Sequence, residues 1–121
     1  MKSTSKQEET KQEVKMQEAF ALWKNTSKSG KDYLKGQDFN KNKLVGFFNT
    51  NKKNPKEPDV RIYSVNADGN QDKEIASLWD YKSQNGKQYL SGITDEKEKL
   101  VAFYGSKEKA PYIRAYFKEE N

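Results

Sequence analysis

The sequence predicts an all-β protein in which two tandem four-stranded antiparallel meanders share one core. Short β-prone runs alternate with turns rich in Gly, Asn, Ser and Lys, which is typical of a meander. An internal repeat then divides the chain into two similar units. With 121 residues in total, each unit has roughly 50 residues, a size at which a separate hydrophobic core is marginal. We therefore expect the two units to build a common core.

The repeat keeps a constant register over most of its length. The segment Leu22–Gly36 recurs as Leu78–Gly92, an offset of 56 positions, and Leu44–Phe48 recurs as Leu100–Tyr104 at the same offset. Near the end of each unit the offset becomes 53, because Arg61 recurs as Arg114. The three missing residues are expected in a loop. Within the long segment the matching pairs are Trp23 and Trp79, Gly30 and Gly86, Tyr33 and Tyr89, and Gly36 and Gly92.

The first β repeat is expected over residues 20–66. A turn at 27–30 places Gly30 where the backbone can adopt φ > 0, and Gly36 is expected to end or kink the second strand. Residues 37–42 are then expected to form a polar loop. The segment 51–58 contains two prolines, which cannot donate to a ladder, and is expected to form a long basic turn. The strands are expected at 20–25, 31–35, 43–49 and 60–65.

The second β repeat is expected over residues 75–121, after a linker turn at 67–74 that contains Asp68-Gly69. Residues 1–19 form a polar tail, rich in Lys, Glu and Gln, that is predicted to be disordered or a frayed helix. Its functional alternative is an arm that binds a partner. The strands of the second repeat are expected at 75–82, 87–93, 99–104 and 112–118.

The composition limits the possible chemistry. The formal net charge of +5 favours an anionic partner. The chain has no Cys and no His, so it lacks thiolate and imidazole ligands, cysteine nucleophiles and the commonest general base. We therefore expect a non-catalytic protein without metal or cofactor. The polar N-terminus contains no apolar run that could serve as a signal peptide or membrane span, which predicts a cytoplasmic protein with no membrane partner.

Alternation along the strands sorts the side chains into two faces. One face is aliphatic and can form the core, with Leu22, Leu34, Leu44 and Ile62. The opposite face carries aromatic rings and cations, which suits single-stranded DNA or RNA because unpaired bases stack on rings while cations neutralise phosphates. The predicted nucleic-acid-binding residues are Trp23, Lys31, Tyr33, Arg61, Tyr63, Trp79, Lys87, Tyr89, Arg114 and Tyr116.

Two alternatives explain the same residues. In the first, the Trp and Tyr side chains line the contact between the two units, and each Arg packs over a neighbouring ring. In the second, the aromatic and Arg-bearing face binds a protein, with the large side chains as hot spots. The two binding hypotheses differ in their salt dependence, since binding to phosphates weakens steeply as salt rises.

Motifs of other site classes are incomplete. The segment 64–69 begins like a calcium-binding loop, but its twelfth position is Ile75, where a bidentate Glu is required. Neither Gly30-Lys31 nor Gly86-Lys87 has the preceding spaced glycine of a phosphate-binding loop. Asp32, Asp59 and Asp80 each occur in only one copy of the repeat, so no catalytic residues are predicted.

The hairpin Leu22-Trp23-Lys24-x-Thr26-Ser27-x-x-Gly30-Lys31-x-Tyr33-Leu34 and the strand Pro58-Asp59-x-Arg61-Ile62-Tyr63 resemble a family of small uncharacterised bacterial proteins. These proteins are encoded on plasmids, integrative elements and phages, and show a Trp-Lys-Lys-Thr-Ser hairpin ending in Tyr-Leu and an Ala-Pro-Asp-Tyr-Arg-Val strand. The second unit matches more loosely, since Asp80-Tyr81 replaces Lys-Asn. The resemblance implies a mobile-element setting. It is compatible with a nucleic-acid-handling accessory protein or with an inhibitor of a host enzyme.

Overall fold

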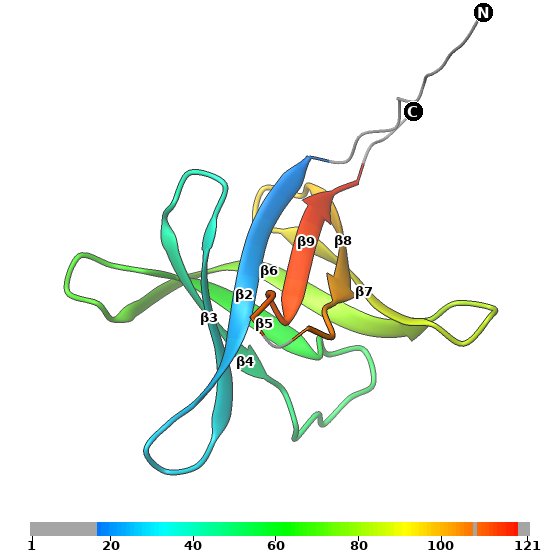
Figure 1. Ribbon diagram of the computed structural model, residues 1–121, viewed down its shortest axis with the longest axis horizontal. Coiled ribbons are helices and arrows are strands. Elements are labelled where there is room, and N and C mark those ends of the chain that lie inside the picture. The colour runs from blue at the N-terminus through cyan, green and yellow to red at the C-terminus, as the bar shows by residue number, and fades with distance from the viewer. Residues whose placement is uncertain (1–16, 108, 119–121) are drawn as a thin grey trace, which may run out of the picture.

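The computed structural model describes residues 17–107 and 109–118, and all their regular structure is β-strand. This confirms the all-β prediction. Figure 1 shows the strands around one central barrel, with hairpin turns projecting from it in several directions. The strands are β2 (Glu18–Thr26), β3 (Asp32–Asp38), β4 (Lys43–Phe48), β5 (Val60–Val65), β6 (Gln71–Lys82), β7 (Gln88–Thr94), β8 (Lys99–Tyr104) and β9 (Ile113–Phe117).

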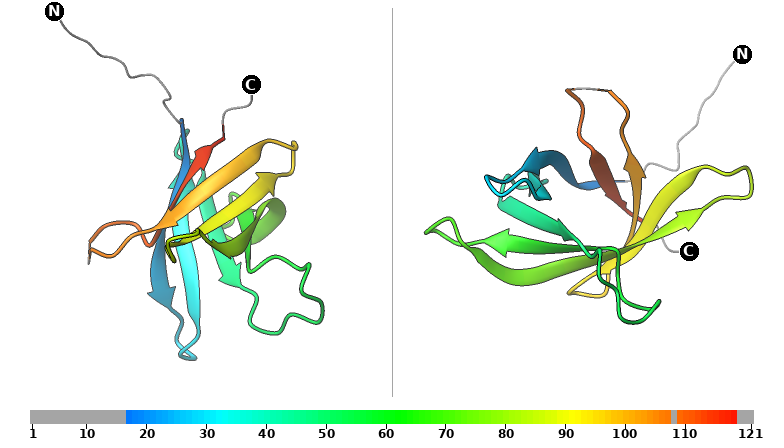
Figure 2. Two further views of the ribbon diagram at one scale, coloured as in Figure 1. Left: turned by 90° about the vertical axis from the view of Figure 1, so that its right-hand side faces the viewer. Right: turned by 90° about the horizontal axis from the view of Figure 1, so that it is seen from below.

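The strands form a closed antiparallel barrel in sequence order. Each strand pairs with the next along the chain, and β2 also pairs with β9, with Leu22 opposite Ile113. Strand order and closure could not be read from the sequence. Closure leaves none of these strands with an unpaired edge, and Figure 2 shows the barrel from two further directions. β3 and β4 therefore lie across the barrel from β7 and β8.

The barrel interior is aliphatic. The core aliphatics expected from strand alternation, Leu22, Leu34, Leu44 and Ile62, are all buried. Their counterparts in the second half, Leu78, Leu90, Leu100 and Ala115, are fully buried as well. Val60 and its counterpart Ile113 add to the interior, together with Phe20, Ala76 and Ala102. Both halves thus contribute to one core, as the size of each unit requires.

Strand β3 continues through Gly36 to Asp38, so the expected strand end at Gly36 is wrong and the loop expected at 37–42 is shorter, covering residues 39–42. The reason is a close approach of β3 to β2. A Cβ atom on Gly36 would lie 1.9 Å from the carbonyl oxygen of Ala21, and one on Gly92 would lie 2.0 Å from that of Ser77. Glycine is thus required where the strands pack backbone to backbone, not where a strand ends.

Two expected boundaries also move. Glu18 and Ala19 belong to β2, and Ala19 is buried, so the expected tail is wrong for these residues; β2 extends to reach β9. The remainder of the predicted tail, residues 1–16, lies outside the described residues. The expected linker is shorter as well, because the turn covers 66–70 and β6 starts at Gln71.

Three hairpin turns share one geometry, with glycine at positive φ. Gly30 and Gly86 have φ of 85° and 86°, and each donates its N–H to the carbonyl of the serine three residues earlier, at 2.9 Å. Gly69 repeats this arrangement with Asn66 at the turn between β5 and β6. The turns predicted at 27–30 and around Asp68-Gly69 are therefore present.

The two seams between the halves carry equivalent ion pairs. Arg61 on β5 contacts Glu74 on β6, with an N–O distance of 3.2 Å. Arg114 on β9 contacts Glu18 on β2 at 3.8 Å. Glu18 and Glu74 are themselves 56 positions apart. In both seams the ladder shifts register at this glutamate, which brings it opposite Tyr63 or Tyr116. Each half thus supplies an arginine to a glutamate of the other.

Aromatic rings close one end of the barrel. Tyr112 packs edge-on against Tyr104 and Phe48, with ring centroids 5.5 and 6.2 Å apart. The Tyr104 hydroxyl donates a hydrogen bond to the Asp80 carboxylate. Burial, this hydrogen bond and the charge of Asp80 raise the pKa of Tyr104 far above its usual range near 10. Tyr104 corresponds to Phe48 in the first half.

In residues 17–107 and 109–118, no helix is long and apolar enough to cross a membrane.

Gly36→Ala should destabilise the barrel, because the added methyl group would overlap the backbone of β2. We expect a loss of about 1–3 kcal/mol in the free energy of unfolding, the usual cost of overpacking. Urea titration followed by circular dichroism measures this loss. Gln37→Ala, at the neighbouring exposed position on β3, is the control and should change stability by less than about 0.5 kcal/mol. Equal stability of the two variants would contradict the close approach.

Tyr104→Phe should reduce the alkaline sensitivity of the fold. Because the pKa of Tyr104 is raised in the folded protein, its neutral hydroxyl contributes fully to the free energy of unfolding below a pH of about 10. This contribution is progressively lost as the pH rises toward the folded-state pKa. The wild-type unfolding free energy should therefore fall more between pH 9 and 11 than that of the variant. The other tyrosines are common to both proteins and cancel in this comparison. Parallel pH profiles would show that Tyr104 ionises as easily in the folded chain as in the unfolded one.

Candidate functional site

The outer face of the first half carries the aromatic and cationic side chains that the sequence indicated. Strand pairing places Trp23 opposite Lys35, Lys35 opposite Val45, and Val45 opposite Tyr63. Two residues further along β2 and β4, Asn25 lies opposite Tyr33, and Phe47 lies opposite Arg61. These side chains alternate with the buried leucines, so they project outward. They form a continuous outer surface over β2, β3, β4 and β5.

A groove of about 730 Å³ lies on this surface. Its aromatic lining comes from Trp23, Tyr33 and Phe47, and its cationic lining from Lys35 and Lys43. The turn between β5 and β6, which projects from the barrel (Figure 1), contributes Gly69, Asn70 and Gln71 to the lining. No Asp or Glu is among its lining residues. We call this the first groove.

Trp23 is held at its polar edge. The indole Nε1–H donates a hydrogen bond of 3.3 Å to the carbonyl oxygen of Lys109, in the loop between β8 and β9. The side chain is still 39% exposed. Buried tryptophans usually satisfy this N–H inside the protein, whereas here the bond orients an indole that remains open to a ligand. The first groove therefore contains a ring that is both positioned and accessible.

Phe47 is the second open ring of the first groove. It is 39% exposed and packs against Tyr63 at a centroid distance of 5.9 Å with an interplanar angle of 59°. Tilted aromatic pairs of this kind are favourable and restrict the motion of both rings. Tyr63 itself is half-buried and is not part of the groove lining. Tyr63 therefore contacts Phe47 from outside the groove lining and helps to position its ring.

Both predicted arginines are paired with carboxylates. Arg61 Nη1 lies 3.3 and 3.2 Å from the two carboxylate oxygens of Glu74, and the Ser77 hydroxyl donates a further bond of 2.9 Å to the same carboxylate. Arg114 pairs with Glu18. Both arginines thus pair with glutamates, whereas the alternative hypothesis placed each arginine over a neighbouring aromatic ring. The lysines of the first groove have no such carboxylate beside them in the lining.

The ten predicted residues fall into two groups on opposite sides of the barrel. Trp23 and Tyr33 line the first groove, Arg61 and Tyr63 lie beside it, and Lys31 is exposed in the β2–β3 turn. In the second half Trp79 donates to the Lys56 carbonyl at 2.9 Å, and Tyr89 stacks on Tyr81 at 5.9 Å. The remaining members there are Lys87, exposed in its turn, Arg114, and Tyr116, which packs against Phe103 at 6.1 Å.

The Trp and Tyr residues of this set do not fill the contact between the halves. The buried hydrophobic core of the described chain contains no Trp and no Tyr. Each tryptophan donates its N–H to a loop of the opposite half, Trp23 to the Lys109 carbonyl and Trp79 to the Lys56 carbonyl. The predicted Trp and Tyr side chains thus lie on the outer surface of the barrel.

Three of the aromatic and cationic residues that line the first groove were missed by reasoning from the sequence: Lys35, Lys43 and Phe47. The signal for Phe47 was present, because alternation places it opposite in face to Leu44 and Gly46, and it recurs as Phe103. Lys35 alternates with Leu34 in the same way. Nothing in the sequence distinguished these lysines from the many others, since the groove depends on how the β5–β6 turn folds beside β4.

The carboxylates near the barrel end are engaged in structural contacts. One oxygen of Asp59 lies 3.1 Å from the Lys52 ammonium, and the other accepts the Asp80 backbone N–H at 2.8 Å. Asp80 accepts from Tyr104. Among the residues that the structure describes, no group of three or more Asp or Glu side chains is arranged to hold a metal ion.

Comparisons with protein-family models, curated proteins and solved structures give no match to this chain.

Proposed function

We propose that the protein binds single-stranded DNA or RNA in the first groove. The observation that carries this proposal is the composition of the lining: three aromatic rings and two lysines, without a carboxylate. Aromatic rings stack on bases, and lysines neutralise phosphates. A cluster of acidic side chains would repel a polyanion, and the groove has none.

The geometry suggests how a strand is held. Bases stack on Trp23 and Phe47, whose rings are accessible and fixed by neighbouring contacts. Phosphates contact Lys35 and Lys43 on the adjacent strands β3 and β4. Stacking is tolerant of sequence because every base has a π face. The proposed activity is therefore binding without strong sequence preference.

The paired arginines have a smaller role in this proposal than the lysines. An arginine already engaged by a glutamate would have to exchange that partner for a phosphate. Arg61 and Arg114 instead hold the two seams of the barrel, where partly exposed ion pairs contribute roughly 0–1 kcal/mol each. The mobile-element setting implied by the sequence resemblance fits an accessory protein that handles single strands.

A protein partner is the second candidate. The observation in its favour is Phe39, which is 66% exposed in the turn between β3 and β4 and lies outside the first groove. An exposed apolar side chain at a hairpin tip is suited to a protein interface. A mobile-element inhibitor of a host enzyme would use such a surface. This candidate predicts that Phe39, and not Trp23, determines partner binding.

Trp23→Ala and Phe47→Ala should each weaken binding of a fluorescently labelled oligothymidylate about tenfold or more. The reason is that base stacking contributes about 1–3 kcal/mol per ring, and 1.4 kcal/mol corresponds to a factor of ten. Fluorescence anisotropy measures the affinity. Phe39→Ala is the matched control, since it removes an exposed ring of the same type outside the groove. The proposal fails if Phe39→Ala weakens binding as much as Phe47→Ala, or if the wild type does not bind.

Replacing Lys35 and Lys43 together by Gln should flatten the salt dependence of binding. For single strands the slope of log K against log salt is about −0.7 per phosphate contact, so losing two contacts should reduce its magnitude by about 1.4. Titrations at several salt concentrations measure this slope. Lys73→Gln serves as the control, because Lys73 pairs with Asp95 at 3.2 Å outside the groove. An unchanged slope in the double variant would place the phosphates elsewhere.

A further inference from the structure

We infer that the barrel is bivalent: the second half carries a separate binding groove for single-stranded nucleic acid, on the side opposite the first. This inference rests on the proposed function of the first groove. It goes beyond that function because it predicts that one protein molecule holds two strands, or two distant segments of one strand, at the same time.

The observation behind it is a second groove of about 370 Å³, lined by residues that correspond to those of the first. Trp79 takes the place of Trp23, Gly92 of Gly36, and Lys99 of Lys43. The two sets are related by the same offset of 56 positions that relates the repeats. No Asp or Glu lines this second groove.

The aromatic surface of the second groove is built differently. Tyr81 replaces Asn25 and is 49% exposed, and it stacks on Tyr89 with an interplanar angle of 29°. Trp79 is half-buried and fixed by its bond to the Lys56 carbonyl. The second groove therefore presents an open tyrosine where the first has an amide. A base can stack on the exposed part of the Tyr81 ring, because the stacking contact with Tyr89 holds this ring in place.

The two grooves differ in lining and in volume. The turn between β5 and β6 borders the first groove, through Gly69, Asn70 and Gln71. In the second half the strand equivalent to β5 is β9, and Lys118, just beyond it, corresponds to Val65. Lys118 lines the second groove and adds a cation where Val65 is apolar. Because the second groove is smaller, about 370 Å³ against about 730 Å³, we expect it to bind more weakly than the first.

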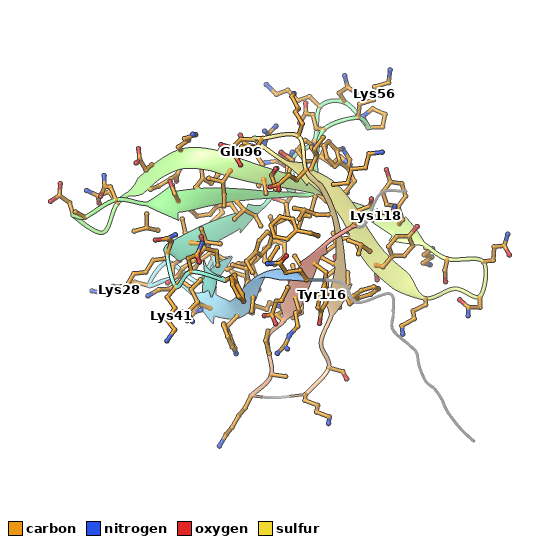
Figure 3. The ribbon with its side chains drawn as sticks, turned by 90° about the horizontal axis from the view of Figure 1, so that it is seen from above. Lys28, Lys41, Lys56, Glu96, Tyr116 and Lys118 are labelled. Atoms are coloured by element: carbon orange, nitrogen blue, oxygen red, sulfur yellow. The ribbon has the colours of Figure 1, made fainter. Side chains whose placement is uncertain are left out.

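The two grooves lie on opposite sides of the barrel. β3 and β7, which carry Gly36 and Gly92, are four strands apart in a closed ring of eight. At about 4.8 Å between strands, the path around the backbone is roughly 19 Å, and it is longer over the side chains. In Figure 3 the first-half lysines Lys28 and Lys41 lie to one side of the barrel, and Lys118 lies toward the other. One short oligonucleotide cannot fill both.

The test uses a thymidine tetranucleotide, near the lower end of the roughly 4–16 nucleotides that single-strand binding domains cover. Isothermal titration calorimetry at low salt should give two tetranucleotides per wild-type protein. Trp79→Ala together with Tyr81→Ala should retain one, bound with the affinity of the stronger site, and Trp23→Ala should retain one at the weaker site. Circular dichroism and urea titration identify the variants that remain folded.

A second readout tests bridging directly. Donor- and acceptor-labelled tetranucleotides mixed with wild-type protein should show energy transfer that is lost when protein is in large excess, because the two labels then bind different molecules. The Trp79→Ala, Tyr81→Ala variant should show no transfer. If the wild type binds one tetranucleotide and this variant binds as the wild type does, bivalency is wrong while the first groove stands. If neither protein binds, the proposed function itself has failed.

Discussion

Closure of the barrel through β2 and β9 is the constraint on which the rest of the structure depends. Each half supplies four strands with one aliphatic face, and neither can cover that face alone at its size. Pairing of Leu22 with Ile113 on one seam, and of Val60 with Leu78 on the other, completes the interior. The contacts across the seams are reciprocal, since each half gives the other an Arg–Glu pair and a bond from a tryptophan to a loop carbonyl. These reciprocal contacts position the outer surface of each half.

This interdependence explains how the tryptophans are positioned on the outer surface. The interior is filled mainly by aliphatic side chains, with Phe20 among them, and the indoles lie at outward positions of β2 and β6. Their N–H groups are satisfied by carbonyls of Lys109 and Lys56. The ring faces remain available beside lysines. The outward positions of the indoles, combined with loops that reach across from the opposite half, thus build the surface on which we propose that bases stack.

The sequence was informative wherever a signal is local. Alternation assigned Leu22 and Leu34 to the core and Trp23 and Tyr33 to the other face, and glycine identified the turns at Gly30 and Gly69. It failed at Gly36, where a glycine that favours a strand end is needed for close backbone packing with Ala21. Strand alternation also assigned all the aromatic residues to one face, whereas closure of the barrel places them on two opposite sides of the molecule. The pairing of Arg61 with Glu74 depends on a register shift between β5 and β6, which composition and spacing do not encode.

The most direct test of the central claim is to map the ligand by NMR on the wild-type protein. The two indole N–H signals and the backbone amides of β2, β3 and β4 report on the first groove independently of affinity. On titration with an oligothymidylate, we expect the largest shift changes at the Trp23 indole and at the amides around Lys35 and Phe47. Changes confined to the 49–59 loop, with the Trp23 indole unaffected, would contradict it.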